Sequence, residues 1–599
     1  MGTYFPNYYH SMDREYFRGE PAQFGVSTPP FEAQLQALKA RIREGATVVE
    51  LGFTGTAKGS MAGKATTPEM YGKEEREAIR ELAKVNKVEL SVHGTTGVMG
   101  FAGLTRHGFS REVAEEVLHE IERTIDFAAD TAEGGAVVFH IGEWKRPIAE
   151  VDNKFATYPE EAEKEEYVWV ADAETGNIEA IPKVHPIFEP KIVDWKVKEG
   201  KKVPVYAYDE QGKIVVVPKR FEDVVNEERK RDPEIARALD EGILKPEQVW
   251  LKHFFESQKL IYEAEATRWT AEAEERRKKL ESINELLVQA KKPGGEKLIE
   301  EFLRAAEMAP PPGVNIIEHL EEQKRRLEVD IEWMQKSALS SQEHLENLRM
   351  KEKMLRPLKD VGLERTTDTI ARAGLYAYDQ TQVKGLKRPI LVSPEPWLPE
   401  YYGSHPSELA ELIQKSREKM AQLLAKERGI SKSEALKIAE KHIGATFDIG
   451  HAYTWRKFFE PKPGETFEQA DKRFNKWLID SVRELFKKGI IGHVQMSDNF
   501  GYYDEHLPPG SGKAPIKEFL EEMKKAKVEI KPIVEPAHHD IRAWHAALRS
   551  FGGQVYGIGN WADIEHSYFG RTQPPYFATG EFLPVQREWQ MSYFGIPFE

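Results

Sequence analysis

Short runs rich in β-branched residues recur along this chain, and helical patterns follow most of them. Strands that alternate with helices predict a parallel sheet in an α/β fold, and eight such units are the number that closes into a (β/α)8 TIM barrel. An open, doubly wound sheet is the alternative, but it normally has a glycine-rich phosphate loop after its first strand, and none is apparent here. The expected strands are residues 24–27, 47–51, 88–92, 136–139, 389–392, 445–447, 490–496 and 528–534.

A large insertion interrupts this alternation in the loop after the fourth strand. Its first part, residues 167–219, alternates Val, Tyr and Trp with polar residues, which predicts a small β-rich region. Its second part has apolar residues on an alternating four-three spacing, which predicts a coiled-coil-like helical hairpin that reverses at residues 293–295 and 310–313. The spaced residues are Leu280, Ile283 and Leu287, then Leu327, Ile331, Met334, Ala338, Leu345, Leu348 and Leu355.

These patterns predict four parts of the chain. Residues 1–144 form the first half of the barrel, residues 145–362 the insertion, residues 363–566 the second half, and residues 567–599 an aromatic and proline-rich tail. The insertion and the tail are both candidate contacts for a homo-oligomer. The insertion is alternatively a lid over the substrate, because a loop that leaves the carboxyl end of a barrel strand emerges on the catalytic face.

The composition excludes several kinds of site. The 599 residues include no cysteine, which excludes a disulfide framework, a zinc finger, an iron–sulfur cluster and a thiol nucleophile. The net charge of -14 argues against a general nucleic-acid coat protein. Neither a signal peptide nor a membrane-spanning run is visible, so we expect a cytoplasmic protein without a membrane partner. Heavy use of Glu and Lys suits a thermophile.

Histidine and carboxylate residues stand at the carboxyl ends of six expected strands or in the loops that follow. In a barrel these positions converge, and so many buried groups of like charge would be costly without a metal. Ligands without sulfur suit zinc, manganese or iron, and their number favours two or three divalent ions bridged by Glu395 and Glu535. The candidate metal ligands are His93, His140, Glu395, Asp448, His451, His493, Asp504, His506 and Glu535.

These residues lie in the ordered segments HGT, FHIG, SPEPW, DIGHAY, HVQMSDN, DEHLPPGSG and VEP. The set resembles the endonuclease IV and xylose isomerase-like barrel superfamily (AP endonuclease family 2) over roughly residues 20–143 and 363–555. In endonuclease IV, the corresponding strand ends bind a trinuclear zinc cluster. The resemblance implies that His93, His140 and Glu395 serve one side of such a cluster. Glu395 and Glu535 would bridge to ions held by Asp448, His451, His493, Asp504 and His506.

The resemblance implies a metal-dependent phosphodiester hydrolase with a metal-bound hydroxide as the nucleophile, and abasic-site DNA is one substrate of this class. The alternative is a sugar or sugar-phosphate isomerase or epimerase, in which Glu395 and Glu535 transfer the proton. Isomerases of this fold bind one ion and commonly lack the histidines on strands three and four, so His93 and His140 favour the hydrolase. A third hypothesis is a non-enzymatic scaffold.

The substrate partner is therefore DNA or a small sugar or phosphate compound. The glycine-rich loop after the second strand contains Lys58 and Lys64, which are candidate substrate contacts. A flexible surface loop is the alternative interpretation of that segment.

Overall fold

The structure is a computed structural model that describes residues 24–56, 66–148, 151, 154–156, 166–198, 201–207, 209, 215–241, 243–305 and 313–535. The chain divides into two compact units, residues 1–161 together with 362–599, and residues 162–361. The expected tail at residues 567–599 and the candidate contacts Lys58 and Lys64 lie outside the described residues.

The first unit is a TIM barrel, as the strand pattern predicts. Eight parallel strands follow the order β12-β4-β3-β2-β1-β15-β14-β13, and their residues are almost all buried. Hydrogen bonds also join the two end strands, because Gly444 N–H donates to Val392 O at 3.1 Å and the Thr446 hydroxyl donates to the Ser393 hydroxyl at 2.8 Å. The strands are β1 (Gly25–Ser27), β2 (Val48–Gly52), β3 (Glu89–His93), β4 (Gly135–Ile141), β12 (Ile390–Pro396), β13 (Ala445–Asp448), β14 (Ile491–Met496) and β15 (Ile533–Val534).

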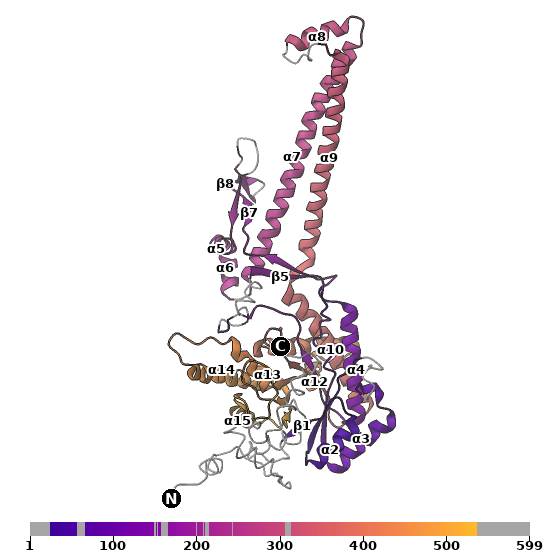
Figure 1. Ribbon diagram of the computed structural model, residues 1–599, viewed down its shortest axis with the longest axis vertical. Helices are drawn as coiled ribbons and strands as arrows, with labels where there is room; N and C mark the ends of the chain where they lie inside the picture. The colour runs from indigo at the N-terminus through magenta and orange to yellow at the C-terminus, as the bar shows by residue number, and fades with distance from the viewer. Residues whose placement is uncertain are drawn as a thin grey trace, which may run out of the picture. The chain divides into compact units, whose positions relative to one another are not determined.

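Amphipathic helices surround these strands, several of them around the lower part of Figure 1. In α4 (Arg111–Thr131), Ile121, Ile125 and Ala128 repeat at helical spacing and are fully buried. Ser110 caps this helix, because its hydroxyl accepts a hydrogen bond from Val113 N–H at 3.2 Å. The other helices of the unit are α2 (Gln34–Arg43), η2 (Pro68–Met70), α3 (Lys73–Asn86), α10 (Leu358–Val383), α11 (Pro406–Arg428), α12 (Lys432–His442), α13 (Ile449–Tyr453), η5 (Thr454–Phe458), α14 (Phe467–Lys487) and α15 (Ile516–Lys525).

The observed elements differ from the sequence pattern at three places in the barrel. The eighth strand is only Ile533–Val534, because Pro532 has no N–H for a strand ladder and the residues before it lie outside the sheet. The sequence pattern places the first helix at residues 30–43, but the helix begins at Gln34, after a turn that includes Pro30. A further helix, α12, precedes β13, and Ser431 caps it by accepting from Glu434 N–H at 3.4 Å.

The second unit combines short antiparallel strands with long helices. In Figure 1, α7 (Pro246–Ala290) and α9 (Ile316–Met354) run side by side, with α8 (Gly295–Ala305) at their far end. Ile331, Met334, Ala338 and Leu345 are buried along α9, in agreement with the four-three spacing. The remaining elements are β5 (Tyr167–Asp172), β6 (Ile178–Pro182), β7 (Ile187–Pro190), β8 (Ile192–Lys198), β9 (Lys201–Tyr206), β10 (Val216–Lys219), α5 (Phe221–Arg231), α6 (Pro233–Asp240) and β11 (Leu355–Pro357).

The helical pattern is expected to continue to Leu355, but Leu355 is not part of the helix. It belongs to β11, which pairs antiparallel with β5 through Leu355 and Asp172, so the helix ends one residue earlier. The spacing of apolar residues cannot reveal where the helix ends, because the strand that pairs with Leu355, β5, lies far away in the sequence.

Among the described residues, no helix has the length and apolar character that a membrane span requires.

Candidate metal centre

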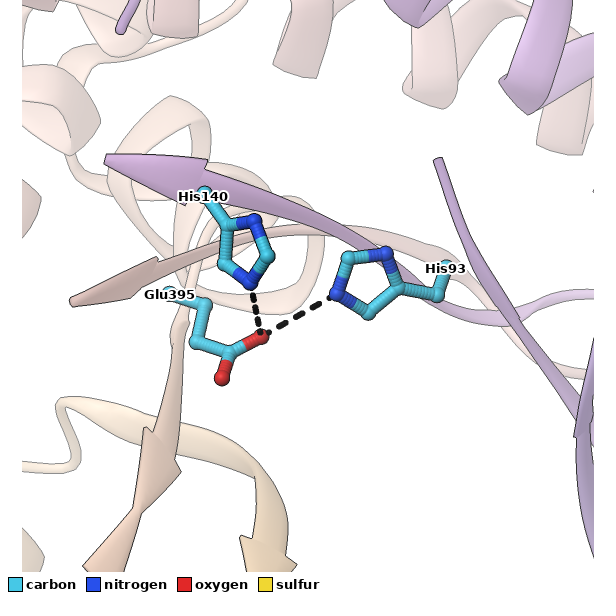
Figure 2. Close-up of side chains that lie close together, drawn as sticks. All are labelled: His93, His140 and Glu395. Carbon is cyan, nitrogen blue, oxygen red and sulfur yellow. Dashed lines mark hydrogen bonds and ion pairs between the residues drawn. The ribbon is translucent and has the colours of Figure 1, made fainter. Parts of the chain in front are cut away.

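The register of three strands brings His93, His140 and Glu395 together. Glu395 on β12 pairs directly with His140 on β4, while His93 on β3 pairs with Val138, two residues before His140. Because side chains alternate across a strand, all three project to the same face. Figure 2 shows both histidine rings directed at one oxygen of Glu395, with Nε2 of His93 at 3.3 Å and Nε2 of His140 at 3.8 Å from Oε2.

A second group consists of His451, Asp504 and His506. His451 lies on α13, directly after β13, and the other two lie in the loop after β14. Nε2 of His451 is 3.1 Å from Oδ2 of Asp504 and 3.2 Å from Nε2 of His506. Nε2 of His506 is 2.9 Å from the same Asp504 oxygen.

A third group, Glu395, Asp448 and His451, connects the first two. In each of the three groups the ligand atoms lie within 4.8 Å of one another. Glu395 and His451 each belong to two groups, so the described residues form one continuous cluster and not three separate sites. Seven of the nine candidate ligands belong to these groups, and the other two, His493 and Glu535, lie outside them.

The polypeptide backbone fixes the orientation of three histidines. Nδ1 of His93 bonds to Gly94 O at 2.8 Å, Nδ1 of His451 to Pro396 O at 2.8 Å, and Nδ1 of His506 to Glu535 O at 3.2 Å. Since a carbonyl oxygen only accepts hydrogen bonds, each Nδ1 carries the hydrogen. Nε2 is then the nitrogen with the free lone pair in the neutral ring, which is the arrangement that backbone carbonyls impose on metal-binding histidines.

The Nε2 atoms of His451 and His506 therefore place two lone pairs 3.2 Å apart when both rings are neutral. Such an approach is repulsive unless a proton or a cation lies between the two nitrogens. With metal–ligand bonds of about 2.0–2.2 Å, neighbouring ligand atoms are about 2.8–3.1 Å apart at octahedral angles and about 3.3–3.6 Å apart at tetrahedral angles. The observed separations of 2.9–3.2 Å are close to the octahedral spacing.

Several buried polar atoms of the cluster lack a hydrogen-bond partner among the described residues. They are Oδ2 of Asp448, Oδ1 of Asp504, Oε2 of Glu535 and Nδ1 of His493. Unsatisfied buried polar groups are rare in folded proteins and cost about 1–3 kcal/mol each. Their concentration at one end of the barrel fits a set of metal ligands.

The electrostatics divide the histidines into two classes. Burial lowers the pKa of His140 to about 3 and that of His493 to about 4, so both rings are neutral at pH 7. Burial also disfavours the charged form of His93, but the nearby Glu395 carboxylate outweighs it and raises the pKa of His93 to about 10. Asp504 likewise outweighs burial and raises the pKa of His506 to about 10. The two protonated rings, His93 and His506, therefore lie beside the carboxylates of Glu395 and Asp504.

The two carboxylates expected to bridge differ in their protonation. Burial raises the pKa of Glu535, so the proton is held more firmly there. For Glu395, burial is outweighed by the hydrogen bonds and charges of His451 and His93, which hold its pKa well below the usual range. One carboxyl group therefore favours the acid form and the other the carboxylate.

Asp448 and Asp498 shape the loops around the cluster. Asp448 Oδ1 accepts from His451 N–H at 3.1 Å and from the Ser497 hydroxyl at 3.0 Å, which leaves Oδ2 for a ligand. Asp498 accepts from the backbone N–H groups of Gly510, Gly512 and Ala514 at 2.8–3.0 Å. These bonds close the loop that contains Asp504 and His506, so they position the second group.

Sequence reasoning missed Glu50, which is fully buried at the centre of the barrel. Its carboxylate accepts from Gln495 Nε2 at 2.7 Å and from the Ser91 hydroxyl at 3.0 Å, and Oε2 is 3.4 Å from Nε2 of His493. Burial raises the pKa of Glu50 to about 7. A charged residue within a buried strand is a signal that the sequence offers, because such a residue needs a polar partner.

Comparisons with known proteins give limited information. No family model matches the chain. A segment of 100 residues is 37% identical to an uncharacterised protein of Methanocaldococcus jannaschii and covers 16% of this chain and 28% of that relative. The chain thus matches under a third of that relative's length.

Two solved structures are similar over most of the chain, at low identity. One is a D-tagatose 3-epimerase-like protein, 12% identical with a TM-score of 0.34, and the match covers 88% of this chain and 97% of that one. The other is a candidate sugar phosphate isomerase/epimerase of Anabaena variabilis, 11% identical with a TM-score of 0.30, covering 86% and 80%. Matches at this level do not identify a reaction.

Proposed function

We propose that this chain is a divalent-metal-dependent enzyme that binds two or three cations at the carboxyl end of its barrel. The observation that supports this most strongly is the set of three overlapping groups of histidine and carboxylate atoms, each within 4.8 Å. A single ion uses four to six ligands, fewer than the cluster and its two neighbours offer. Donors of nitrogen and oxygen without sulfur suit zinc, manganese or iron.

The residues of each group would hold one ion. His93, His140 and Glu395 would hold the first, and His451, Asp504 and His506 the second. Asp448 would hold a third ion together with Glu395, and His493 and Glu535 would complete its ligands, because the one free ring nitrogen of His451 serves the second ion. Bound cations at such a site supply Lewis acidity, which stabilises negative charge that develops on substrate oxygens.

The first candidate reaction is the isomerisation or epimerisation of a sugar or sugar phosphate. Two acidic side chains support it, Glu395 at the end of β12 and Glu535 directly after β15, because a proton-transfer reaction needs one group that accepts a proton from carbon and one that donates it. Glu395 would remove the proton from carbon and Glu535 would return one.

The second candidate reaction is the hydrolysis of a phosphodiester. The histidines of the first and second groups support it, because a proton shuttle on one ion has no use for His93, His140 and His506. Several positive charges close together suit the negative charge that builds up on a phosphoryl group in the transition state. In this reaction, Glu395 would act as the bridging ligand between two cation positions.

The two reactions can be separated in one series of assays. The chain loaded with zinc or manganese is incubated in deuterated water with a panel of aldose and ketose phosphates, and carbon-bound deuterium is followed by NMR. The same preparation is incubated with bis(p-nitrophenyl) phosphate and with a duplex that contains an abasic site. We expect turnover in one arm and its loss, by about a thousandfold, when EDTA removes the metal. Metal-loaded protein that is inactive in both arms would contradict the proposed function.

Metal binding is also expected to release protons. In the metal-free protein at pH 8, His93 and His506 are protonated because their pKa is about 10, whereas His140 and His493 are neutral because their pKa is about 3 and 4. A cation displaces only the protons that are present, so loading should release about two protons per chain from His93 and His506 at pH 8. His451 should add a further proton, because Asp504 and Asp448 outweigh burial and raise its pKa well above the usual value. The affinity for metal should therefore fall as the pH falls from 9 to 7.

A pH-indicator dye in weakly buffered solution measures this release during a zinc titration. The number of protons released should decline as the pH passes through about 10, where both rings lose their protons without metal. Tight zinc binding at pH 8 with no proton release would show that His93 and His506 do not bind the cation through Nε2.

A further inference from the structure

A row of rings leads from the cluster to the protein surface. The ring of His140 stacks near Trp397, with centroids 6.3 Å apart and an interplanar angle of 25°. Trp397 in turn stacks near Tyr401, with centroids 5.8 Å apart and an angle of 19°. Nζ of Lys145 lies over the Tyr401 ring, 5.6 Å from its centroid. One end of the row is a candidate metal ligand and the other end is a cation.

Two paired loops hold this row in place. The segment after β4 and the segment after β12 are joined by hydrogen bonds from Tyr402 N–H to Trp144 O at 2.8 Å and from Arg146 N–H to Glu400 O at 3.3 Å. Lys145 and Tyr401 form an antiparallel bridge between them. The rings of Trp144 and Tyr402 stack with centroids 4.4 Å apart and are only 2% exposed, so they serve the packing beneath the row.

Further contacts make these loops rigid. The Arg146 guanidinium binds both oxygens of the Glu408 carboxylate, at 2.9 and 2.8 Å, and both side chains are buried. Gly142 lies under the row, since a Cβ atom at that position would be 3.5 Å from the Trp397 ring and 3.6 Å from the Tyr401 ring. A platform with a fixed shape loses little conformational entropy when a ligand binds.

The members of the row remain accessible, in contrast to the rings beneath them. Trp397 and Tyr401 are half-buried, and Lys145 is exposed. Within the described part of the chain, Lys145 forms no ion pair, so its charge is available to an anion. Aromatic faces bind flat or ring-shaped groups by stacking, worth about 1–3 kcal/mol for a nucleobase, and an ammonium group binds phosphate as a point charge.

We propose that Trp397, Tyr401 and Lys145 form a second part of the substrate site, which binds a ring that bears a phosphate. The ring lies against Trp397 and Tyr401, and the phosphate approaches Lys145, while the reacting group reaches the cluster beside His140. The inference rests on the proposed function and extends it to the substrate. Two small molecules share this chemistry, a sugar phosphate and a nucleotide, and they differ in whether a base is present.

Isothermal titration calorimetry of the metal-loaded chain tests the proposal with four probes, namely ribose 5-phosphate, ribose, adenosine 5′-monophosphate and adenosine. We expect at least one phosphorylated probe to bind about tenfold more tightly than its unphosphorylated partner. Lys145→Gln should abolish this preference, and Lys488→Gln, which changes an exposed lysine at the end of α14, should preserve it. Trp397→Ala should weaken binding of the ring about tenfold, whereas Trp397→Phe, which still stacks, should weaken it about threefold or less.

The comparison of probes assigns the ligand. Tighter binding of the nucleotide than of ribose 5-phosphate indicates a base on the platform, and the reverse order indicates a sugar ring. Equal affinities for all four probes, or affinities that Lys145→Gln and Trp397→Ala leave unchanged, would overturn the proposal.

Metal content, measured on the same preparations, separates this inference from the proposed function. Variants that retain their metal and their turnover constant but show a raised KM support the platform. A wild-type chain that binds metal and turns over substrate without any effect of these variants rejects the platform alone. A chain that binds no metal rejects the proposed function, and the probes then test the platform in the metal-free protein.

Discussion

Replacing Glu395 by glutamine is expected to reduce kcat/KM by about a thousandfold, the largest effect of any single substitution in the cluster. Glu395 is fully buried and belongs to two of the three groups of ligand atoms. Glutamine keeps the size of the side chain but removes the negative charge that pairs with His93 and His451. Two cation positions would lose a ligand at once, so elemental analysis of the purified variant should show a loss of about one or more ions per chain.

Glu143→Gln is the matched control. Glu143 is also fully buried and follows β4, but its carboxylate accepts from the backbone N–H groups of Phe101 and Ala102 and from the Thr366 hydroxyl. This control should lower the melting temperature and retain the metal. A Glu395→Gln protein with full metal content and wild-type activity would contradict the assignment of Glu395 as a shared ligand.

The double variant His93→Asn/His140→Asn is expected to lose one cation and to distinguish the two candidate reactions. These two histidines, with Glu395, form the first group, and they contribute nothing to the groups around Asp448 and His451. If the enzyme hydrolyses a phosphodiester with several cations, activity should fall by about a thousandfold or more. If it moves a proton with Glu395 and Glu535 on one ion, most activity should remain.

His442→Asn controls for the loss of a buried histidine. Nδ1 of His442 bonds to Ile390 O at 2.8 Å, and the side chain belongs to none of the three groups among the described residues. The His442→Asn protein should keep every cation and full activity. Unchanged metal content in the His93→Asn/His140→Asn protein would show that the first group binds no ion, and the assignment of a cation to His93, His140 and Glu395 would then fail.

The barrel could be predicted because its signals are local. Alternation of strands and helices is visible in single segments, and polar residues at strand ends meet by the geometry of a closed parallel sheet. Glu395 and His140 illustrate this, since their strands are far apart in the sequence but adjacent in register. The same reasoning placed Asp448 and His451 beside them.

Other features depend on contacts that no local pattern contains. Leu355 continues a helical spacing, but a strand partner at Asp172 ends the helix before it. The Asp498 carboxylate closes a loop through N–H groups that are 12–16 residues further on. The row from His140 to Lys145 requires two loops to pair, so its members, Trp397 and Tyr401, could not be distinguished from ordinary aromatic residues in the sequence.

The most direct test of the multinuclear proposal is anomalous X-ray diffraction from crystals grown with zinc, recorded on both sides of the zinc absorption edge. The proposal predicts two or three strong peaks, one between His93, His140 and Glu395, one between His451, Asp504 and His506, and the third beside Asp448. A single peak at Asp448 would restrict the enzyme to one-ion chemistry. No peak at any of the three positions in fully soaked crystals would contradict the proposed metal centre.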